Sequence, residues 1–195
     1  MQAIETIYNG YRFRSRLEAR WAVFFDTLNI SWEYEKEGYD LGNGVSYLPD
    51  FWLPTLNYWI EIKGKFPTPE EISKLDKLTE GKFGHAFIFS GEVGLWRMRN
   101  VYENHMLVNT IFEGTSIMGK DEYGWDGDWR ILECPTCGLI QVSQWWCPAT
   151  WAQCGCEDPY TEDMRINDIQ QKTPRLIAAY KAARQAQFEH GKHGN

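Results

Sequence analysis

Two carboxylates and a lysine stand at a spacing that suits metal-assisted chemistry on phosphate esters. Asp50 closes the stretch Tyr47-Leu-Pro-Asp50, and Glu61-Ile-Lys63 begins eleven residues later. A phosphodiester is anionic and resists attack by water, so its cleavage benefits from a divalent cation that offsets charge and acidifies the water. Carboxylate oxygens are suitable ligands for Mg²⁺ or Mn²⁺. The spacing therefore predicts a divalent-metal site that includes Asp50 and Glu61.

The stretch Tyr-Trp-Ile-Glu-Ile-Lys-Gly at 58–64 indicates a strand. Alternate residues of a strand share a face, so we expect Glu61 and Lys63 on one face while Ile60 and Ile62 point into the core. The Glu61 and Lys63 side chains would then begin roughly 6–7 Å apart. Lys63 is expected to orient water or to contact the phosphate. Glu61 and Lys63 can also lie on a solvated strand face without function, and Asp50 after Pro49 can be an ordinary turn residue.

Hydrophobic periodicity and capping patterns predict the elements that position these residues. The expected order is helix, three strands, helix and strand, at residues 15–28, 32–41, 45–53, 58–64, 68–81 and 85–90. Thr68, Pro69 and Glu71 form an N-terminal capping pattern for the second helix. The two carboxylates and the lysine therefore belong to neighbouring strands.

These motifs resemble the PD-(D/E)XK nuclease superfamily, which has the restriction-endonuclease-like fold. Pro49-Asp50 match PD, and Glu61-Ile62-Lys63 match (D/E)XK. The resemblance implies an α/β fold with an αβββαβ core and a mixed sheet, to which this chain adds a small zinc ribbon and a C-terminal helix. It also implies a Mg²⁺- or Mn²⁺-dependent DNA endonuclease in which Asp50 and Glu61 bind the metal and Lys63 is catalytic.

The stretch from Tyr11 to Phe25 is similar to phage-encoded members of this superfamily related to transposon-end-cutting and junction-resolving nucleases. Branched or junction DNA in phage DNA processing is accordingly a candidate substrate, and a homodimer is a candidate assembly. The alternative function is a non-catalytic nucleic-acid-binding or host-interaction module on the same fold. The motifs are also compatible with a nuclease that acts on RNA.

Glu18 is the fourth candidate for the site. The resemblance implies that a carboxylate of the first helix joins the metal site and its chemistry, and Glu18 matches that position. Ser15-x-x-Glu18 is also a capping box, which satisfies N–H groups at the start of a helix and needs no metal. Both interpretations stay open from the sequence alone.

The chain has 195 residues, of which 43% are hydrophobic, which is enough for one core and a small appendage. We expect a nuclease domain at 1–132, a zinc-ribbon insertion at 133–168 and a basic C-terminal helix at 169–195. No run of about 18 apolar residues and no signal-peptide pattern is present. These patterns predict a cytoplasmic protein without a membrane partner, in the host cytoplasm if it is phage-encoded.

The net charge of −7 is unevenly distributed. Residues 9–20 carry four arginines against one glutamate, and residues 170–195 carry five basic side chains against one acidic one. Phosphate contacts need a basic patch rather than a basic protein. The candidate DNA-binding residues are Arg12, Arg16, Arg20, Lys181 and Arg184. Solvated helix faces would give the same pattern.

All five cysteines lie between 134 and 156. Cys134-Pro-Thr-Cys137 is followed by glycine, which is typical of a zinc knuckle, and Cys154-Gly-Cys156 offers a second half-site. We therefore expect a structural zinc ion bound by these four cysteines, with Cys147 as an alternative ligand. A redox pair or a disulfide is the competing interpretation. Residues 119–128 are predicted to form a loop before this ribbon.

Overall fold

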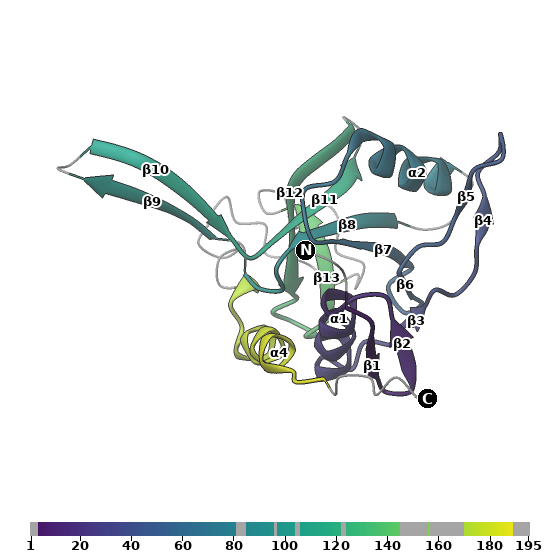
Figure 1. The fold of residues 1–195 in the computed structure, drawn as a ribbon. Coiled ribbons are helices and arrows are strands. Elements are labelled where there is room, and N and C mark those ends of the chain that lie inside the picture. The colour runs from purple at the N-terminus through teal and green to yellow at the C-terminus, as the bar shows by residue number, and fades with distance from the viewer. Residues whose placement is uncertain are drawn as a thin grey trace.

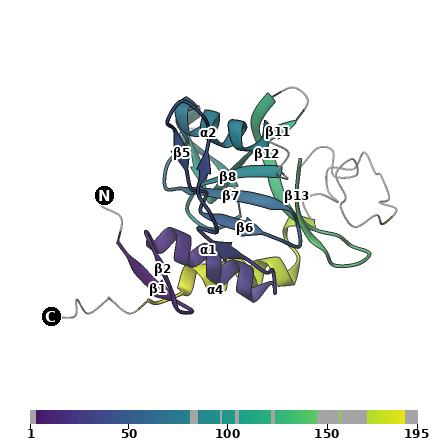
Figure 2. The ribbon, with the colours of Figure 1, turned by 90° about the vertical axis from the view of Figure 1, so that its right-hand side faces the viewer.

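The computed structural model describes residues 4–80, 85–95, 97–103, 106–121, 124–144, 156 and 170–188. They form three layers, in which a seven-stranded mixed sheet lies between α2 on one face and α1 with α4 on the other (Figure 1, Figure 2). The mixed α/β class expected from the sequence is confirmed. No helix among these residues has the length and apolar character needed to cross a membrane.

The described elements cover all parts of the predicted core. Their bounds are β1 (Thr6–Tyr8), β2 (Tyr11–Phe13), α1 (Arg16–Thr27), β3 (Glu33–Tyr34), β4 (Tyr39–Asp40), β5 (Ser46–Tyr47), β6 (Phe51–Leu53), β7 (Tyr58–Lys63), α2 (Pro69–Glu80), β8 (His85–Gly91), β9 (Arg97–Glu103), β10 (Met106–Glu113), β11 (Thr115–Asp121), β12 (Gly124–Glu133), β13 (Ile140–Gln144) and α4 (Pro174–Gln185). The helices expected at 15–28 and 68–81 are present, as are the strands expected at 58–64 and 85–90.

The runs predicted at 32–41 and 45–53 are each divided into two short strands. The chain leaves β3 through Glu35, whose φ of 45° is left-handed, and it reverses between β4 and β5 through Asn43, whose φ is 54°. Such backbone conformations interrupt a strand because extended residues have negative φ. As a result β4 and β5 form a separate hairpin, and β3 and β6 remain in the main sheet.

The main sheet has the strand order β13-β12-β11-β8-β7-β6-β3. β7 and β8 run parallel, with Glu61 opposite Ile88 and Lys63 opposite Ser90, and the other neighbours are antiparallel. Parallel neighbours need a long crossover, which α2 provides. The carboxyl ends of β7 and β8 therefore lie side by side.

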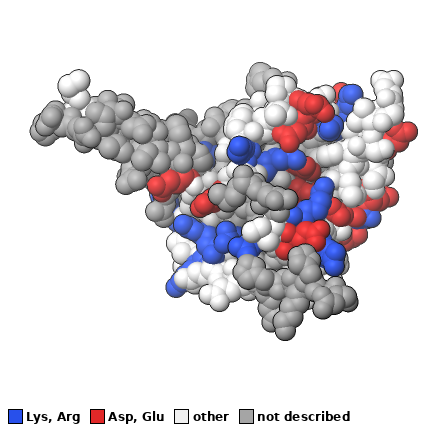
Figure 3. Space-filling view, viewed as in Figure 1, with Lys and Arg blue, Asp and Glu red and all other residues white. Residues whose placement is uncertain are grey.

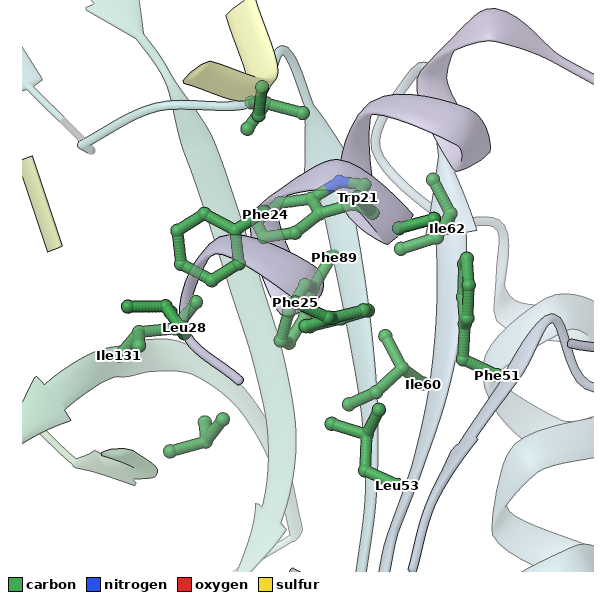
Figure 4. Packing of buried hydrophobic residues seen from close by; sticks show 14 of the residues in the cluster. Trp21, Phe24, Phe25, Leu28, Phe51, Leu53, Ile60, Ile62, Phe89 and Ile131 are labelled. Carbon is green, nitrogen blue, oxygen red and sulfur yellow. The ribbon is translucent and has the colours of Figure 1, made fainter. Parts of the chain in front are cut away.

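One core lies between the sheet and the helices α1 and α4. Trp21, Phe24 and Phe25 of α1 pack toward Ile60 of β7 and Phe89 of β8 (Figure 4). α4 joins this core through its buried face, which consists of Leu176, Ala179, Tyr180 and Ala183. Complete burial of a large apolar side chain contributes roughly 1.5–3 kcal/mol, so the C-terminal helix is held mainly by this contact.

A smaller core lies on the opposite face of the sheet, under α2. Leu75 and Leu78 of α2 cover Trp59 of β7 and Ile88 of β8. Trp59 and Ile60 are consecutive and reach different cores, as the alternation of side chains in a strand requires. β7 is therefore buried on both faces, and Glu61 within it is only 6% exposed.

The loop predicted at 119–128 is wrong. β11 and β12 pair there as antiparallel strands of the main sheet. Gly119 has the appearance of a turn residue, but a Cβ at this position would come within 2.7 Å of the Trp129 ring and 2.8 Å of the Phe87 ring. This glycine therefore makes room for two large side chains on neighbouring strands, a common use of glycine within sheets.

Residues assigned to different predicted domains contact one another closely. β13 begins after the first cysteine pair and adds to the main sheet beside β12. Arg175 of α4 donates from Nη2 to the carbonyl of Leu28 at the end of α1, at 2.8 Å, and from Nη1 to the carbonyl of Gly138, also at 2.8 Å. The division at 132 and 168 stays a prediction. β9 and β10 form an arm that projects from the sheet (Figure 1).

Candidate metal and catalytic site

Three carboxylates from three elements are buried at one end of the sheet. Glu18 lies in the first turn of α1, Asp50 directly precedes β6, and Glu61 lies in β7, with 7%, 3% and 6% of their surfaces exposed. Phe51 is paired with Ile60, so the antiparallel register places Asp50 beside Glu61. Burial of charged groups is costly without partners, and the partners of each carboxylate therefore define the site.

Asp50 is held by a guanidinium and by the backbone of β7. Its Oδ1 accepts a hydrogen bond from Arg14 Nη2 at 2.7 Å, and its Oδ2 accepts one from the Ile62 N–H at 2.7 Å. Burial raises the pKa of Asp50 well above its usual value, and the negative charges of Glu61 and Glu18 raise it further. The Ile62 N–H and Arg14 oppose this rise. The three carboxylates thus repel one another within one electrostatic environment.

Glu61 is held between a lysine and a tyrosine. Its Oε1 lies 2.7 Å from Lys63 Nζ, and its Oε2 accepts a hydrogen bond from the Tyr47 hydroxyl at 2.8 Å. Burial would lower the pKa of Lys63, but the charges of Glu61, Glu71 and Asp50 together raise it. Burial also raises the pKa of Tyr47, as does the charge of Glu61. Lys63 is therefore an ammonium group at neutral pH, and Tyr47 is a neutral donor.

Glu18 is a helix cap in this structure. Its N–H donates to Ser15 Oγ at 3.2 Å, and Ser15 Oγ donates to its Oε1 at 2.6 Å. The Tyr34 hydroxyl donates to its Oε2 at 2.6 Å. The Ser15 half of the predicted capping box is confirmed, and Glu18 Oε2 accepts from the N–H of Arg14, the residue before the cap, at 3.1 Å. Oε2 of Glu18 thus accepts two hydrogen bonds, whereas Oε1 accepts one from Ser15 and keeps a second lone pair that could bind a metal. A metal role for Glu18 stays a prediction.

Several site residues were not identified from the sequence. Arg14 bridges Asp50 and Glu35, with its Nε 2.7 Å from Glu35 Oε1. Glu71, expected only as a cap of α2, lies 3.3 Å from Lys63 Nζ. Tyr34 and Tyr47 approach from short strands. Among these residues only Arg14 had a signal in the sequence that could have placed it near the site, because it directly precedes the helix-capping residue Ser15.

The acidic group suits a hard divalent cation by its chemistry, because oxygen ligands with excess negative charge are what Mg²⁺ and Mn²⁺ bind. Its carboxylate oxygens are not gathered closely. Among the described residues, the three ligand atoms that lie within 4.8 Å of one another belong to a cysteine group instead. Arg14 and Lys63 draw Asp50 and Glu61 into separate ion pairs, so the three oxygen ligands would approach one another only when these cations move.

The candidate DNA-binding residues lie on adjacent helices and on β2. Arg12 is exposed and is 3.8 Å from Glu5, whereas Arg16 and Arg20 are partly buried along α1. Lys181 and Arg184 are exposed on α4, which packs against α1. Figure 3 shows Lys and Arg side chains gathered over α4 on one face of the molecule. Contact of all five residues with one duplex stays a prediction.

Three of the predicted zinc ligands come together. Cys134, Cys137 and Cys156 place their sulfur atoms within 4.8 Å of one another, so this group could bind a metal such as zinc. Cys134 and Cys137 flank the tight turn between β12 and β13, where Gly138 has a φ of 73° and its N–H donates to the Cys134 carbonyl at 2.9 Å. Cys147 and Cys154 lie outside the described residues. No disulfide bond involves Cys134, Cys137 or Cys156.

No family model, no curated protein and no solved structure matches this chain.

Proposed function

We propose that the chain is a metal-dependent endonuclease that hydrolyses phosphodiester bonds in DNA. The observation that carries the proposal is the convergence of three buried carboxylates and an ammonium group at the end of β7. Buried like charges destabilise a fold unless they serve a ligand, and perturbed carboxyl groups of this kind are concentrated at functional sites. Branched or junction DNA is the candidate substrate within this proposal, and a homodimer is the candidate assembly.

The arrangement of elements supports a restriction-endonuclease-like core. The chain contains the order of an αβββαβ unit in α1, β3, β6, β7, α2 and β8. Asp50 directly precedes β6, and Glu61 lies near the end of the adjacent strand β7, as the resemblance implies. A structural zinc ion bound by Cys134, Cys137 and Cys156, with a fourth ligand from Cys154 or Cys147, would complete the appendage. Three sulfur ligands are one fewer than a closed structural zinc site requires.

Asp50 and Glu61, with Glu18 beside them, would hold Mg²⁺ or Mn²⁺. Such an ion supplies charge neutralisation for the phosphate and acidifies the attacking water. The Ile62 N–H fixes one oxygen of Asp50, and the Tyr47 hydroxyl fixes one oxygen of Glu61. Because the pKa of Lys63 is raised, Lys63 does not accept the proton of water. Lys63 instead donates a hydrogen bond to the phosphate, and its positive charge stabilises the negative charge that develops there.

Arg14 competes with a divalent cation for Asp50. Its guanidinium is 2.7 Å from Oδ1, the oxygen of Asp50 that the backbone leaves available. Binding of a cation at that oxygen requires Arg14 to move, and Arg14 is 56% exposed, so it can turn toward solvent or a substrate phosphate. Arg14 would then leave the carboxylate when a phosphate is present to receive it.

Arg14→Gln is therefore expected to bind Mn²⁺ more tightly than the wild-type chain. A hydrogen bond to a charged group contributes about 1.5–3 kcal/mol, which corresponds to about tenfold or more in affinity if it must be broken. Titration calorimetry with Mn²⁺ alone measures this without any substrate. Arg12→Gln is the matched control, because Arg12 is exposed and its ion pair is with Glu5, away from the carboxylates. Equal affinity in both variants would contradict the competition.

The proposed activity is tested by incubating the full chain with plasmid, linear duplex, four-way junction and RNA, each with Mg²⁺, Mn²⁺ or a chelator. We expect cleavage of DNA that requires the divalent ion and stops with the chelator. Binding without cleavage under every condition would favour the non-catalytic nucleic-acid-binding or host-interaction module. Cleavage of RNA alone would retain the chemistry and replace the substrate.

A further inference from the structure

A cleft of about 1010 Å³ opens beside the carboxyl ends of β7 and β8. One wall consists of Lys172 and of α4 residues 177, 180, 181, 184 and 185. The other consists of residues 91, 92, 93 and 95 at the end of β8 and after it, and of residues 113 and 114 between β10 and β11. Gly64, which directly follows Lys63, also lines the cleft. Ligands of open α/β sheets commonly bind in such a crevice outside the carboxyl ends of strands.

The wall opposite α4 is a rigid structure. Gly91 and Gly114 have left-handed φ values of 88° and 90°, and a Cβ on Gly114 would come within 2.1 Å of the Leu95 carbonyl oxygen. The Thr115 hydroxyl accepts from the Gly94 N–H at 3.1 Å and donates to the Glu92 carbonyl at 2.7 Å. The two turns are thus held together by the close approach of Gly114 to the Leu95 carbonyl and by the hydrogen bonds of Thr115. The cleft is therefore formed before any ligand binds.

The α4 wall is basic. Ile177, Lys181 and Arg184 recur at a spacing that places them on one face of the helix, beside the buried face that packs in the core. Lys172, Lys181 and Arg184 are all exposed, and Arg184 Nη1 lies 3.5 Å from the position a Cβ would take on Gly94. Glu92 and Glu113 also line the cleft. Three cations against two carboxylates leave a positive lining in a chain with a net charge of −7.

These features select a class of ligand. Basic side chains on an open, preformed wall suit a chain of phosphates, which Lys and Arg bind through charge regardless of sequence. The volume is at the upper end of pockets that enclose a small ligand, about 300–1,000 Å³, so it admits a few nucleotides of one strand but not a duplex. Tyr180, the aromatic residue of the lining, is only 7% exposed and offers little surface for stacking on bases.

We propose that this cleft binds a single-stranded segment of nucleic acid that adjoins the bond to be cleaved. The inference rests on the proposed function, because the continuity from Gly64 to Lys63 is what connects the strand in the cleft to the catalytic residues. The substrate is then a duplex with a single-stranded tail or branch. Lys172, Lys181 and Arg184 bind the phosphates of the tail. Recognition therefore depends on the flexibility of the single strand and not on its base sequence.

The test measures binding without cleavage, in Asp50→Asn protein, by fluorescence anisotropy with a blunt hairpin duplex and with the same duplex bearing a short tail of either polarity. We expect tighter binding of one tailed probe. Lys181→Gln combined with Arg184→Gln should remove that preference, weaken tailed binding about tenfold and flatten its salt dependence by about 1.4 units, since each single-strand phosphate contact contributes about 0.7. Binding of the blunt probe should change little.

The matched control is Lys74→Gln combined with Lys77→Gln, which removes the same charge from α2, away from the cleft. The proposal is overturned if the Asp50→Asn protein shows no preference for a tailed probe, or if the protein with Lys181→Gln and Arg184→Gln keeps that preference. Displacement of the tailed probe by polyglutamate of equal charge also overturns it, because the site would then bind any polyanion, including an acidic protein segment. Tail binding by the Asp50→Asn protein together with no cleavage of any substrate by the wild-type chain would instead refute the nuclease activity, so the two failures are distinguishable.

Discussion

Asp50→Asn is expected to abolish cleavage and also to remove the stabilisation of the fold by Mg²⁺ or Mn²⁺. The loss of one preorganised charged group typically lowers the rate by about 10²–10³. A ligand at 100 times its dissociation constant stabilises a protein by about 2.7 kcal/mol. The wild-type chain should therefore gain several degrees in melting temperature from the ion, and the variant should gain little.

The same substitution should stabilise the metal-free protein at neutral and alkaline pH. The pKa of Asp50 is raised in the folded state by burial and by Glu61 and Glu18. A carboxyl group with a raised folded pKa favours folding fully below its unfolded pKa of about 3.9, and this contribution is lost as pH rises through the folded value. Asparagine does not ionise and can still accept the Ile62 N–H. The stability difference between variant and wild type should therefore grow with pH.

Thermal unfolding with and without Mn²⁺, recorded from pH 4 to 9 beside a cleavage assay, checks both effects. Asp40→Asn is the matched control, because Asp40 is an exposed residue of β4 and its contact is with the Gly42 N–H in its own turn. Cleavage of DNA by the variant at nearly the wild-type rate would show that Asp50 has no catalytic role. Equal stabilisation of the variant and the wild type by Mn²⁺ would show that Asp50 does not bind the metal.

If Cys134, Cys137 and Cys156 bind a metal as proposed, its removal is expected to disturb the main sheet and α4 as well as the appendage. Metal binding in small zinc domains contributes about 10–16 kcal/mol, which is comparable with the whole stability of a domain. The Cys134 to Gly138 turn joins β12 to β13, and the Gly138 carbonyl accepts from Arg175 of α4. The Thr173 hydroxyl at the start of α4 donates to Glu133 beside the turn. Disorder in the turn therefore reaches α4.

Purified protein should contain one zinc ion per chain, and Cys137→Ser should lower solubility and melting temperature before it changes the chemistry of the carboxylate site. Elemental analysis and hydrogen exchange across β13 and α4 measure these effects. Thr136→Ser, an exposed change between the same two cysteines, is the control. Protein without zinc that carries a Cys134 to Cys137 disulfide would support the redox interpretation. Comparison of Cys147→Ser with Cys154→Ser identifies the fourth ligand.

Features that depend on residues close in the chain could be predicted from the sequence. Ser15, Thr68 and Thr173 each accept a hydrogen bond from an N–H in the first turn of a helix, and α1, α2 and α4 begin at the residues that follow them. The alternation along β7 placed Ile60 in the core and Glu61 near Lys63 in the same way. Capping and alternation act over two to four residues, so the local sequence contains the whole interaction.

Other features required the tertiary structure, because their partners are distant in the chain. The Arg14 to Asp50 ion pair spans 36 residues, and the Tyr47 to Glu61 hydrogen bond spans 14. The segment 119–128 was predicted as a loop, but it forms paired strands in which Trp129 and Phe87 fill the space beside Gly119. The cleft joins α4 to turns some 60 to 90 residues earlier. The sequence determined which residue types could do the chemistry. The packing of α1, α4 and the sheet decided which charges face one another, since burial and distance set their energies.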